Sequence, residues 1–166
     1  RMKLIMEELE LKKEDRVPVL PAQQYAEKLR TASKNSDITS VIAFQLPNGK
    51  VITGKATQLM DSCPAAILNS IKVLANISDE IYLLSRVILE TIQNLKRNDL
   101  HSKMTALNAN EILIALSICA VTNPTAQLAY EKLSELKGTQ AHSTVMLNRN
   151  DEQLLKKLGI DITCDP

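Results

Sequence analysis

Aromatic residues are scarce in this chain of 166 residues, which has one phenylalanine, three tyrosines and no tryptophan. A surface that stacks nucleic-acid bases usually needs several aromatic rings, so such a surface has little to be built from. The 20 lysines and arginines are balanced by 19 aspartates and glutamates. The resulting net charge of +1 lacks the basic excess of a nucleic-acid-binding domain, and we expect no nucleic-acid partner.

Long apolar segments are also missing. The longest nearly unbroken run covers residues 112–121 and is interrupted by Ser117, which makes it about half as long as a membrane-spanning helix must be. The beginning of the sequence has no apolar signal region. The three cysteines, Cys63, Cys119 and Cys164, are odd in number and widely spaced, a pattern typical of a reducing compartment. We therefore expect a cytoplasmic protein without a membrane partner.

Groups of metal ligands are absent as well. The two histidines, His101 and His142, are far apart, and neither has a second ligand three or four residues away. The zinc-deaminase pattern is missing, because no His-x-Glu occurs and Cys63-Pro64 reverses the order of Pro-Cys-x-x-Cys. We expect neither a metal nor a cofactor in this chain.

The sequence contains both helical and strand patterns. Residues 40–46 and 50–53 favour strands, and Pro47-Asn48-Gly49 between them has the chemistry of a hairpin turn. Further short strands are expected at residues 17–20, 80–84, 140–147 and 160–163. Helical spacing predicts helices at residues 2–11, after Pro21, and at 62–75, 86–95, 109–120, 124–137 and 149–158, with a polar loop at 34–37.

Side chains that cap helix N-termini precede several of these helices, namely Ser85, Asn108 with Glu111 three residues on, Asn123 before Pro124, and Asn148. In the helix after Ser85, the apolar stripe Val87, Ile88, Ile92 and Leu95 is expected to face inward. The last strand, helix and strand form a parallel β-α-β unit. Together these elements predict an α/β fold, a three-layer α-β-α sandwich with a mixed sheet.

A phosphate-loop-like string occurs where the hairpin ends. Gly49, Gly54 and Lys55 satisfy the Gly-x4-Gly-Lys spacing, but the final Ser or Thr is missing and four strand-forming residues separate the glycines. A true nucleotide loop is therefore not expected. Lys55 and Thr57 could still hold one anion at a strand-to-helix junction. The alternative is a turn glycine beside a solvated lysine.

A second set of candidates has nucleophile and base chemistry. His142 cannot act as the general base for Ser143, because neighbouring side chains on a strand point to opposite faces. It can act on Thr144, which lies on the same face of the strand. Thr122 and Asn123 offer further polar groups at a helix entry. The alternative is that His142 and Thr144 are half-buried sheet residues without a catalytic role.

Several longer sequence segments resemble those of a known protein family. They are residues 122–129 (Thr-Asn-Pro-Thr-Ala-Gln-Leu-Ala), 140–144 (Gln-Ala-His-Ser-Thr), 150–153 (Asn-Asp-Glu-Gln) and the end from Leu158 to Pro166. With them the chain resembles the C-terminal part of a bacterial family called domain of unknown function 1846, over nearly its whole length. Arg86 departs from the family pattern, where a proline is expected.

The resemblance implies that this chain is a fragment of a longer protein whose upstream part holds a glycine-rich, phosphate-loop-like stretch. It also implies a fold similar to that of cytidine deaminases, although the missing zinc ligands put deaminase function in doubt. We expect an N-terminal helical and linker segment at residues 1–38 and the α/β domain at residues 39–166.

Two functions follow as hypotheses. The first is an accessory or structural domain that completes a core, interface or cleft of a larger protein. The second is the half-site of an enzyme in which Thr122, Asn123, His142 and Thr144 bind a small polar or phosphorylated metabolite. The almost wholly apolar helix at 109–120 needs partners around its circumference. We therefore expect it to meet the upstream domain of the same protein or a second copy in a homo-oligomer.

Overall fold

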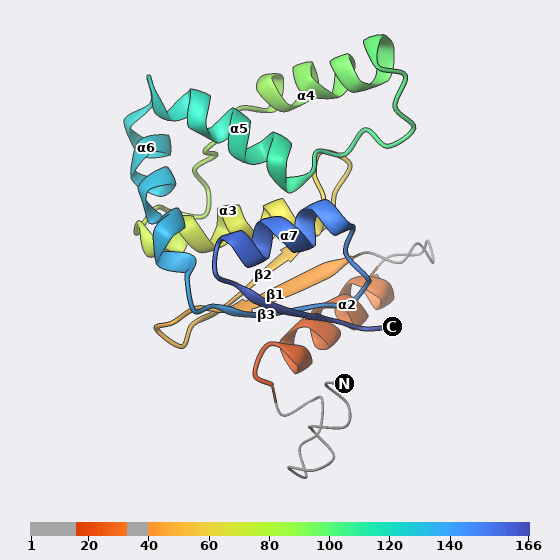
Figure 1. Ribbon diagram of the computed structural model, residues 1–166, viewed down its shortest axis with the longest axis vertical. Coiled ribbons are helices and arrows are strands. Elements are labelled where there is room, and N and C mark those ends of the chain that lie inside the picture. Colours follow the sequence, from red (N-terminus) through yellow and green to blue (C-terminus); the bar gives the residue numbers. More distant parts are fainter. Residues whose placement is uncertain (1–15, 33–39) are drawn as a thin grey trace.

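The computed structural model describes residues 16–32 and 40–166. The helix expected at residues 2–11 and the loop at 34–37 lie outside the described residues. Within these ranges, the fold is an α/β architecture with one mixed sheet and helices on both of its faces (Figure 1).

The sheet has four strands in the order β2-β1-β3-β4. Their bounds are β1 Val41–Gln45, β2 Val51–Lys55, β3 Gln140–Ser143 and β4 Asp161–Cys164. β1 runs antiparallel to both of its neighbours, whereas β3 and β4 are parallel. The hairpin and the closing β-α-β unit predicted from the sequence are confirmed, and Gly49 has the positive φ of 89° that its turn requires.

Side chains of β1 alternate between two apolar layers, as the period of a strand requires. Val41 and Ala43 pack with Ala22 and Ala26 of helix α2 (Val19–Ala32). The intervening side chains belong to the main core, together with apolar residues of helix α3 (Ser62–Leu74). Helix α7 (Arg149–Lys157) covers this second face together with α3, and in the part of the chain that the structure describes α2 is the helix on the first face (Figure 1).

The remaining helices form a further layer above α3. They are α4 (Arg86–Asn94) with the π-helical turn Leu95–Asp99, α5 (Ala109–Ala120), and α6 (Pro124–Tyr130) followed by the 3-10 turn Glu131–Leu136. α5 packs against α3, α6 and α7 (Figure 1). None of the helices in residues 16–32 and 40–166 is long and apolar enough to cross a membrane.

The predicted capping side chains are confirmed. Ser85, Asn123 and Asn148 each accept hydrogen bonds from backbone N–H groups in the first turn of the helix that follows. Asn108 and Glu111 form a complete capping box at the start of α5. These caps form because each involves only groups within three residues of one another, which the sequence already places together.

Two predicted strands are wrong. Residues 17–20 contain a turn that leads into α2, because Pro18 has no N–H for a strand ladder and sits just before the helix. Residues 80–84 form turns; Leu83 and Leu84 are apolar because they enter the core and not because they pair in a sheet. β3 also ends before residue 145, since the Ser143 hydroxyl bonds to both backbone groups of Val145 and turns the chain.

The predicted orientation of α4 is also wrong. Leu89 and Gln93 face the core, whereas Val87 is 72% exposed and Ile88 and Leu95 are exposed as well. Only Ile92 of the predicted stripe reaches the core. The side chain of Gln93 holds α4 in this orientation, because its Nε2 donates a hydrogen bond to the backbone oxygen of Gln58 at 2.6 Å.

Candidate functional site

His142 lies in the middle of β3 and points toward α2. It is paired with Ala43 across the antiparallel ladder, and residues directly opposite each other share a face. Because Ala43 packs against α2, the imidazole is enclosed between that helix and the sheet, where it is fully buried. The histidine therefore needs hydrogen-bond partners from the protein itself.

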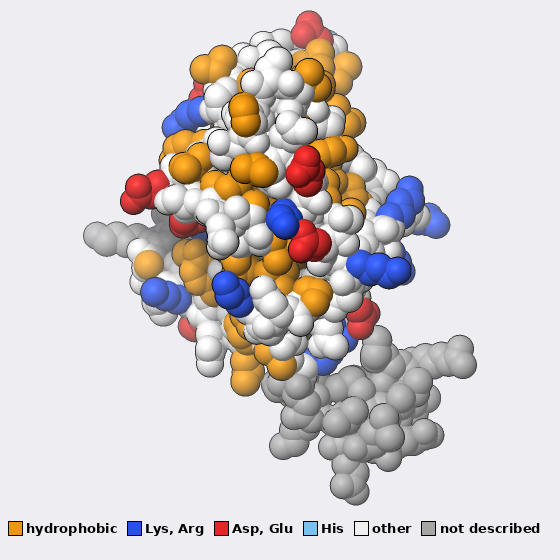
Figure 2. Space-filling view, turned by 90° about the vertical axis from the view of Figure 1, so that its left-hand side faces the viewer, with side chains coloured by type: hydrophobic (Ala, Val, Ile, Leu, Met, Phe, Trp, Pro, Cys, Tyr) orange, Lys and Arg blue, Asp and Glu red, His pale blue; other side chains and the backbone are white. Residues whose placement is uncertain are grey.

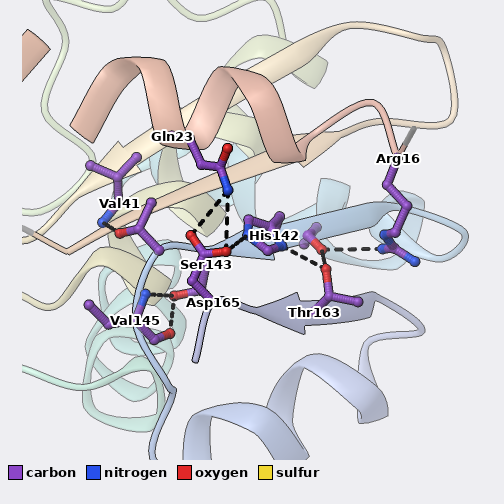
Figure 3. Close-up of polar contacts among 10 residues, drawn as sticks. Arg16, Gln23, Val41, His142, Ser143, Val145, Thr163 and Asp165 are labelled. Carbon is purple, nitrogen blue, oxygen red and sulfur yellow. Dashed lines mark hydrogen bonds and ion pairs between the residues drawn. The ribbon is translucent and has the colours of Figure 1, made fainter. Parts of the chain in front are cut away.

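Both ring nitrogens of His142 have such partners on β4 and just beyond it (Figure 3). Nδ1 lies 2.7 Å from Oγ1 of Thr163, and Nε2 lies 3.1 Å from Oδ1 of Asp165. A neutral ring satisfies both contacts when Nε2–H donates to the carboxylate and the threonine hydroxyl donates to Nδ1. Gln23 of α2 donates from Nε2 to both oxygens of Asp165, at 3.3 and 3.4 Å.

Arg16 adds a second connection between the segment before α2 and the sheet. Its guanidinium donates to Oδ2 of Asp161 at 3.1 Å, and to the backbone oxygens of Ala141 and Asp161. Histidine, threonine and aspartate are the group types of a nucleophile, base and acid. Here these side chains lie between α2 and the sheet, and their hydrogen bonds connect α2 and the segment before it to strands β3 and β4.

Thr144 extends the hydrogen bonding between β1 and β3. Its Oγ1 accepts a hydrogen bond from the backbone N–H of Val41 at 3.1 Å, and its own N–H donates to the oxygen of Val41. His142 thus pairs with Thr163 and Asp165 and not with Thr144. Sequence reasoning missed these two partners, although the predicted β-α-β unit already placed their strand beside β3.

Thr122 and Asn123 lie on the other side of the sheet, at the turn between α5 and α6. Oδ1 of Asn123 accepts from the N–H groups of Thr125 and Ala126, at 3.0 and 3.2 Å. Both residues line a pocket of about 430 Å³ that also contains Tyr82, Ile88 and Cys119. The structure thus does not bring them together with His142 and Thr144, and ligand binding by these four residues stays a prediction.

Lys55 and Thr57 lie at the junction between β2 and α3. Lys55 is exposed, and Oγ1 of Thr57 accepts from the N–H groups of Leu59 and Met60 in a local turn. Gly54 is needed for packing, because an added Cβ would lie 2.6 Å from Cα of Ala66 in α3. The glycine of the phosphate-loop-like string therefore lets a strand and a helix approach closely. Anion binding by Lys55 stays a prediction.

A separate pocket lies where the N-termini of α3 and α7 meet. Its volume is about 240 Å³. It is lined by residues from the start of β1, the junction before α3, the loop before α7 and α7 itself: Ser40, Ala56, Asp61, Ser62, Cys63, Met104, Val145, Met146, Leu147, Asn148 and Asp151. The only charged side chains in this lining are the two aspartates, neither of which sequence reasoning selected.

Both carboxyl groups of this pocket are shifted toward the protonated form. Burial raises the pKa of Asp61, and the charge of Asp151 raises it further. Burial also raises the pKa of Asp151, although hydrogen bonds from the Ala109 N–H and the Asn148 side chain oppose the shift. Burial raises the pKa of the Cys63 thiol, with the same two aspartates adding to the effect, so this cysteine is not an activated thiolate.

Comparison with known proteins gives one family and a group of bacterial relatives. Residues 14–166 match the family model described as "Domain of unknown function DUF1846, C-terminal". The chain is 59% identical over all 166 residues to a UPF0371 protein of Clostridium tetani. It is 58% identical, over the same length, to UPF0371 proteins of Clostridium botulinum and Clostridioides difficile. In each case the chain spans 33% of the relative's length.

Proposed function

Because the chain belongs to the DUF1846 C-terminal domain family, we propose that it is an accessory α/β domain of a longer bacterial protein. In this proposal it completes a core or interface with the region that precedes it in the longer chain. The relatives are about three times as long as this chain, so most of such a protein lies outside the domain. The hairpin followed by α3, and the β3-α7-β4 unit, support a fold similar to that of cytidine deaminases.

One observation supports this proposal above the others, namely an exposed apolar surface on α4 and α5. On α5, Ile114 and Ile118 are 61% and 66% exposed, and Val121 follows on the same side of the helix. Exposed apolar side chains of α4 and of the segment before it, Tyr82, Val87, Ile88 and Leu95, extend the set. We call these seven residues the α4–α5 surface.

In Figure 2, which shows the left-hand side of the view in Figure 1, hydrophobic side chains are exposed among polar and charged ones over much of the face. Scattered single apolar side chains are normal on a protein surface, whereas grouped ones mark interaction sites, and Tyr82 and Ile88 line one pocket with Cys119 of α5. At about 25 cal/mol for each Å² removed from water, covering several such side chains stabilises a complex by a few kcal/mol.

The upstream region of the longer protein is the occupant that we propose for the α4–α5 surface. Relatives that match along all 166 residues carry about two thirds of their length outside the match. A large apolar interface is what fixes two domains of one chain against each other. The other hypothesis, an enzyme half-site built from Thr122, Asn123, His142 and Thr144, has less support, because two of these side chains already have hydrogen-bond partners within the sheet.

We also propose a cytoplasmic location. The thiols of Cys63 and Cys119 form no disulfide, which supports a reducing compartment.

Charge placed on the α4–α5 surface of the full-length protein tests this function. In Ile118→Glu, we expect the upstream region to separate from the domain, so that a hydrophobic dye binds more strongly and amides of α5 exchange faster. Leu20→Glu is the matched control, because Leu20 is also exposed and apolar but lies on α2, on the other face of the sheet. The control is expected to behave like the wild type.

Three results would contradict the proposal. Equal dye binding and amide exchange in wild type, Ile118→Glu and Leu20→Glu would mean that nothing covers the surface. A loss of self-association in Ile118→Glu, measured by sedimentation, would assign the surface to a second copy. Equal disruption by both variants would mean that the effect is not specific to α5.

A further inference from the structure

A further cavity, of about 230 Å³, lies between one face of α3 and the segment that leads from α3 into α4. The side chains that α3 contributes to it recur at helical spacing and so share one side of the helix: Ala65, Leu68, Asn69 and Lys72. From residue 65 to residue 72 an α-helix rises about 10 Å, so the cavity is elongated along α3. Its two ends can therefore receive different parts of one ligand.

Lys72, in the last turn of α3, lies at one end of this cavity and is enclosed almost completely. It is 7% exposed, although proteins almost never bury a lysine without a partner of opposite charge. Its Nζ donates to the backbone oxygen of Asp79 at 2.8 Å, and this is the only hydrogen bond or ion pair of the ammonium group among the described residues. Because an ammonium group has three N–H donors, two of them have no acceptor in the described part of the chain.

The partner that this end of the cavity lacks is a negative charge. Removing an ammonium group from water is costly unless a counter-charge lies beside it, and a backbone oxygen is not one. Asp79 is an exposed residue and reaches Lys72 through its backbone. Nδ2 of Asn69 donates one hydrogen to the backbone oxygen of Thr53 at 3.0 Å and carries a second hydrogen. This end of the cavity thus offers hydrogen-bond donors to an anion.

The rest of the cavity is apolar and defines the body of the ligand. The segment before α3, α3 itself, the segment after it and α4 all contribute to this wall, with Leu59, Met60, Leu68, Leu83, Leu84 and Leu89. Lys72 is the only cationic residue of the lining. A phosphate monoester carries nearly two negative charges at neutral pH, more than one ammonium group balances. A carboxylate carries one, and a hydrocarbon chain attached to it matches the apolar wall.

We propose that this cavity binds a short aliphatic monocarboxylate, with its carboxylate at Lys72 and Asn69 and its hydrocarbon chain directed along α3 toward Leu59 and Met60. The carboxylate accepts hydrogen bonds from the unused donors of Lys72, and the chain covers the apolar wall. The ligand thereby supplies the counter-charge that the fold does not supply.

This site is separate from the docking function proposed above. The cavity shares Tyr82 with the α4–α5 surface, but Ile118, whose substitution tests docking, does not line it. Either proposal can therefore fail while the other holds. Lys72 also has a simpler role, because its bond to Asp79 holds the segment after α3 against the helix. That role affects stability alone and requires no ligand.

The test uses the full-length protein with three compounds: hexanoate, acetate, which lacks the chain, and hexanol, which lacks the charge. Calorimetry measures affinity, and hydrogen exchange of peptides covering residues 59–72 and 79–89 locates the binding. We expect hexanoate to bind and to protect these peptides. Acetate should bind at least tenfold more weakly because it covers little apolar surface. Hexanol should bind at least tenfold more weakly because hydrogen bonds between charged groups are the strong ones.

Lys72→Met keeps an apolar stem of similar length and removes the ammonium group. We expect it to weaken hexanoate binding at least tenfold and to leave hexanol binding unchanged. Lys157→Met is the matched control, because Lys157 also lies in the last turn of a helix but is exposed and outside the lining. It should bind hexanoate like the wild type, and the melting temperature of each variant verifies folding.

Asp79→Asn provides a second variant at an exposed position, which keeps the test decisive if Lys72→Met folds poorly. It removes the only carboxylate of the lining, which repels the head group of the ligand. We expect hexanoate to bind about two- to fivefold more tightly, the range of a charge interaction at a protein surface.

Any of the following results would overturn the proposal. Equal binding of hexanoate and hexanol would make the cavity merely apolar, and equal binding of hexanoate and acetate would make it a simple anion site. A lower melting temperature of Lys72→Met with unchanged hexanoate binding would restrict Lys72 to its structural role. Equal weakening by Lys72→Met and Lys157→Met, or unchanged affinity in Asp79→Asn, would place the carboxylate elsewhere. Binding of none of the three compounds would leave the cavity without this function.

Discussion

Gly54→Ala should destabilise the fold strongly, because β2 and α3 touch at this position. A Cβ built on Gly54 would lie 2.6 Å from Cα of Ala66 and 2.8 Å from the carbonyl carbon of Ala65, and it would also collide with N of Ala66. Carbon atoms in packed proteins are normally separated by about 3.5–4.0 Å. The strand and the helix must therefore move apart by about 1 Å.

The cost follows from what obstructs the new methyl group. Overpacking a core typically costs about 1–3 kcal/mol when side chains can adjust. Here the obstructing atoms belong to the backbone of a helix and cannot rotate away, so we expect a loss of about 3 kcal/mol or more. For a domain of this size, each kcal/mol lowers the melting temperature by roughly 2–4 °C, which predicts a decrease of about 6–12 °C.

Gly49→Ala is the matched control for this prediction. Gly49 has a φ of +89°, and a Cβ added to it would have no other atom within 4 Å. An alanine there meets only backbone strain, about 1–2 kcal/mol. Thermal unfolding of the 166-residue chain, followed by circular dichroism, compares the two variants. A melting temperature of Gly54→Ala equal to or above that of Gly49→Ala would refute the close approach of β2 and α3.

Three further predictions concern the polar residues. Asn123→Ala should lower the free energy of unfolding by about 1 kcal/mol in a urea titration, since the cap of α6 is lost. His142→Leu should cost about 1–3 kcal/mol in the same assay, because Thr163 and Asp165 each lose a buried partner. Asp61→Asn should stabilise the chain at pH 7: the raised pKa means that wild-type stability falls as pH rises above the usual value of 3.8. This advantage should vanish below about pH 4, and an advantage independent of pH would contradict its electrostatic origin.

Local signals in the sequence predicted much of the fold. The hairpin and the four helix caps rest on side chains within a few residues of the backbone groups that they serve, so residue types alone identify them. The orientation of α4 could not be found in this way. Periodicity identifies an apolar face such as Val87 and Leu95, but it does not say whether that face packs inside this domain or against another one.

The polar sites were predicted less well, because each depends on contacts between distant segments. His142 was selected for a possible role beside Thr144, but its partners Thr163 and Asp165 lie on another strand and just beyond it. Asp61 and Asp151 each look like ordinary residues of a helix N-terminus, and only the packing of α3 beside α7 places them on one pocket. A useful signal is an acidic residue at the start of each of two helices that follow strands of the same sheet.

The two faces of the sheet use polar side chains in different ways, and this difference bears on where a ligand binds. Around His142 the chain itself supplies the partners: α2 provides Gln23, and β4 with the residue beyond it provides Thr163 and Asp165. A network satisfied in this way holds elements together and has little to gain from a ligand. On the side of the opposite face, Lys72 of α3 is enclosed at the end of a cavity with one backbone oxygen as its partner. Such an arrangement lowers stability, and proteins tolerate this cost chiefly where a site requires it.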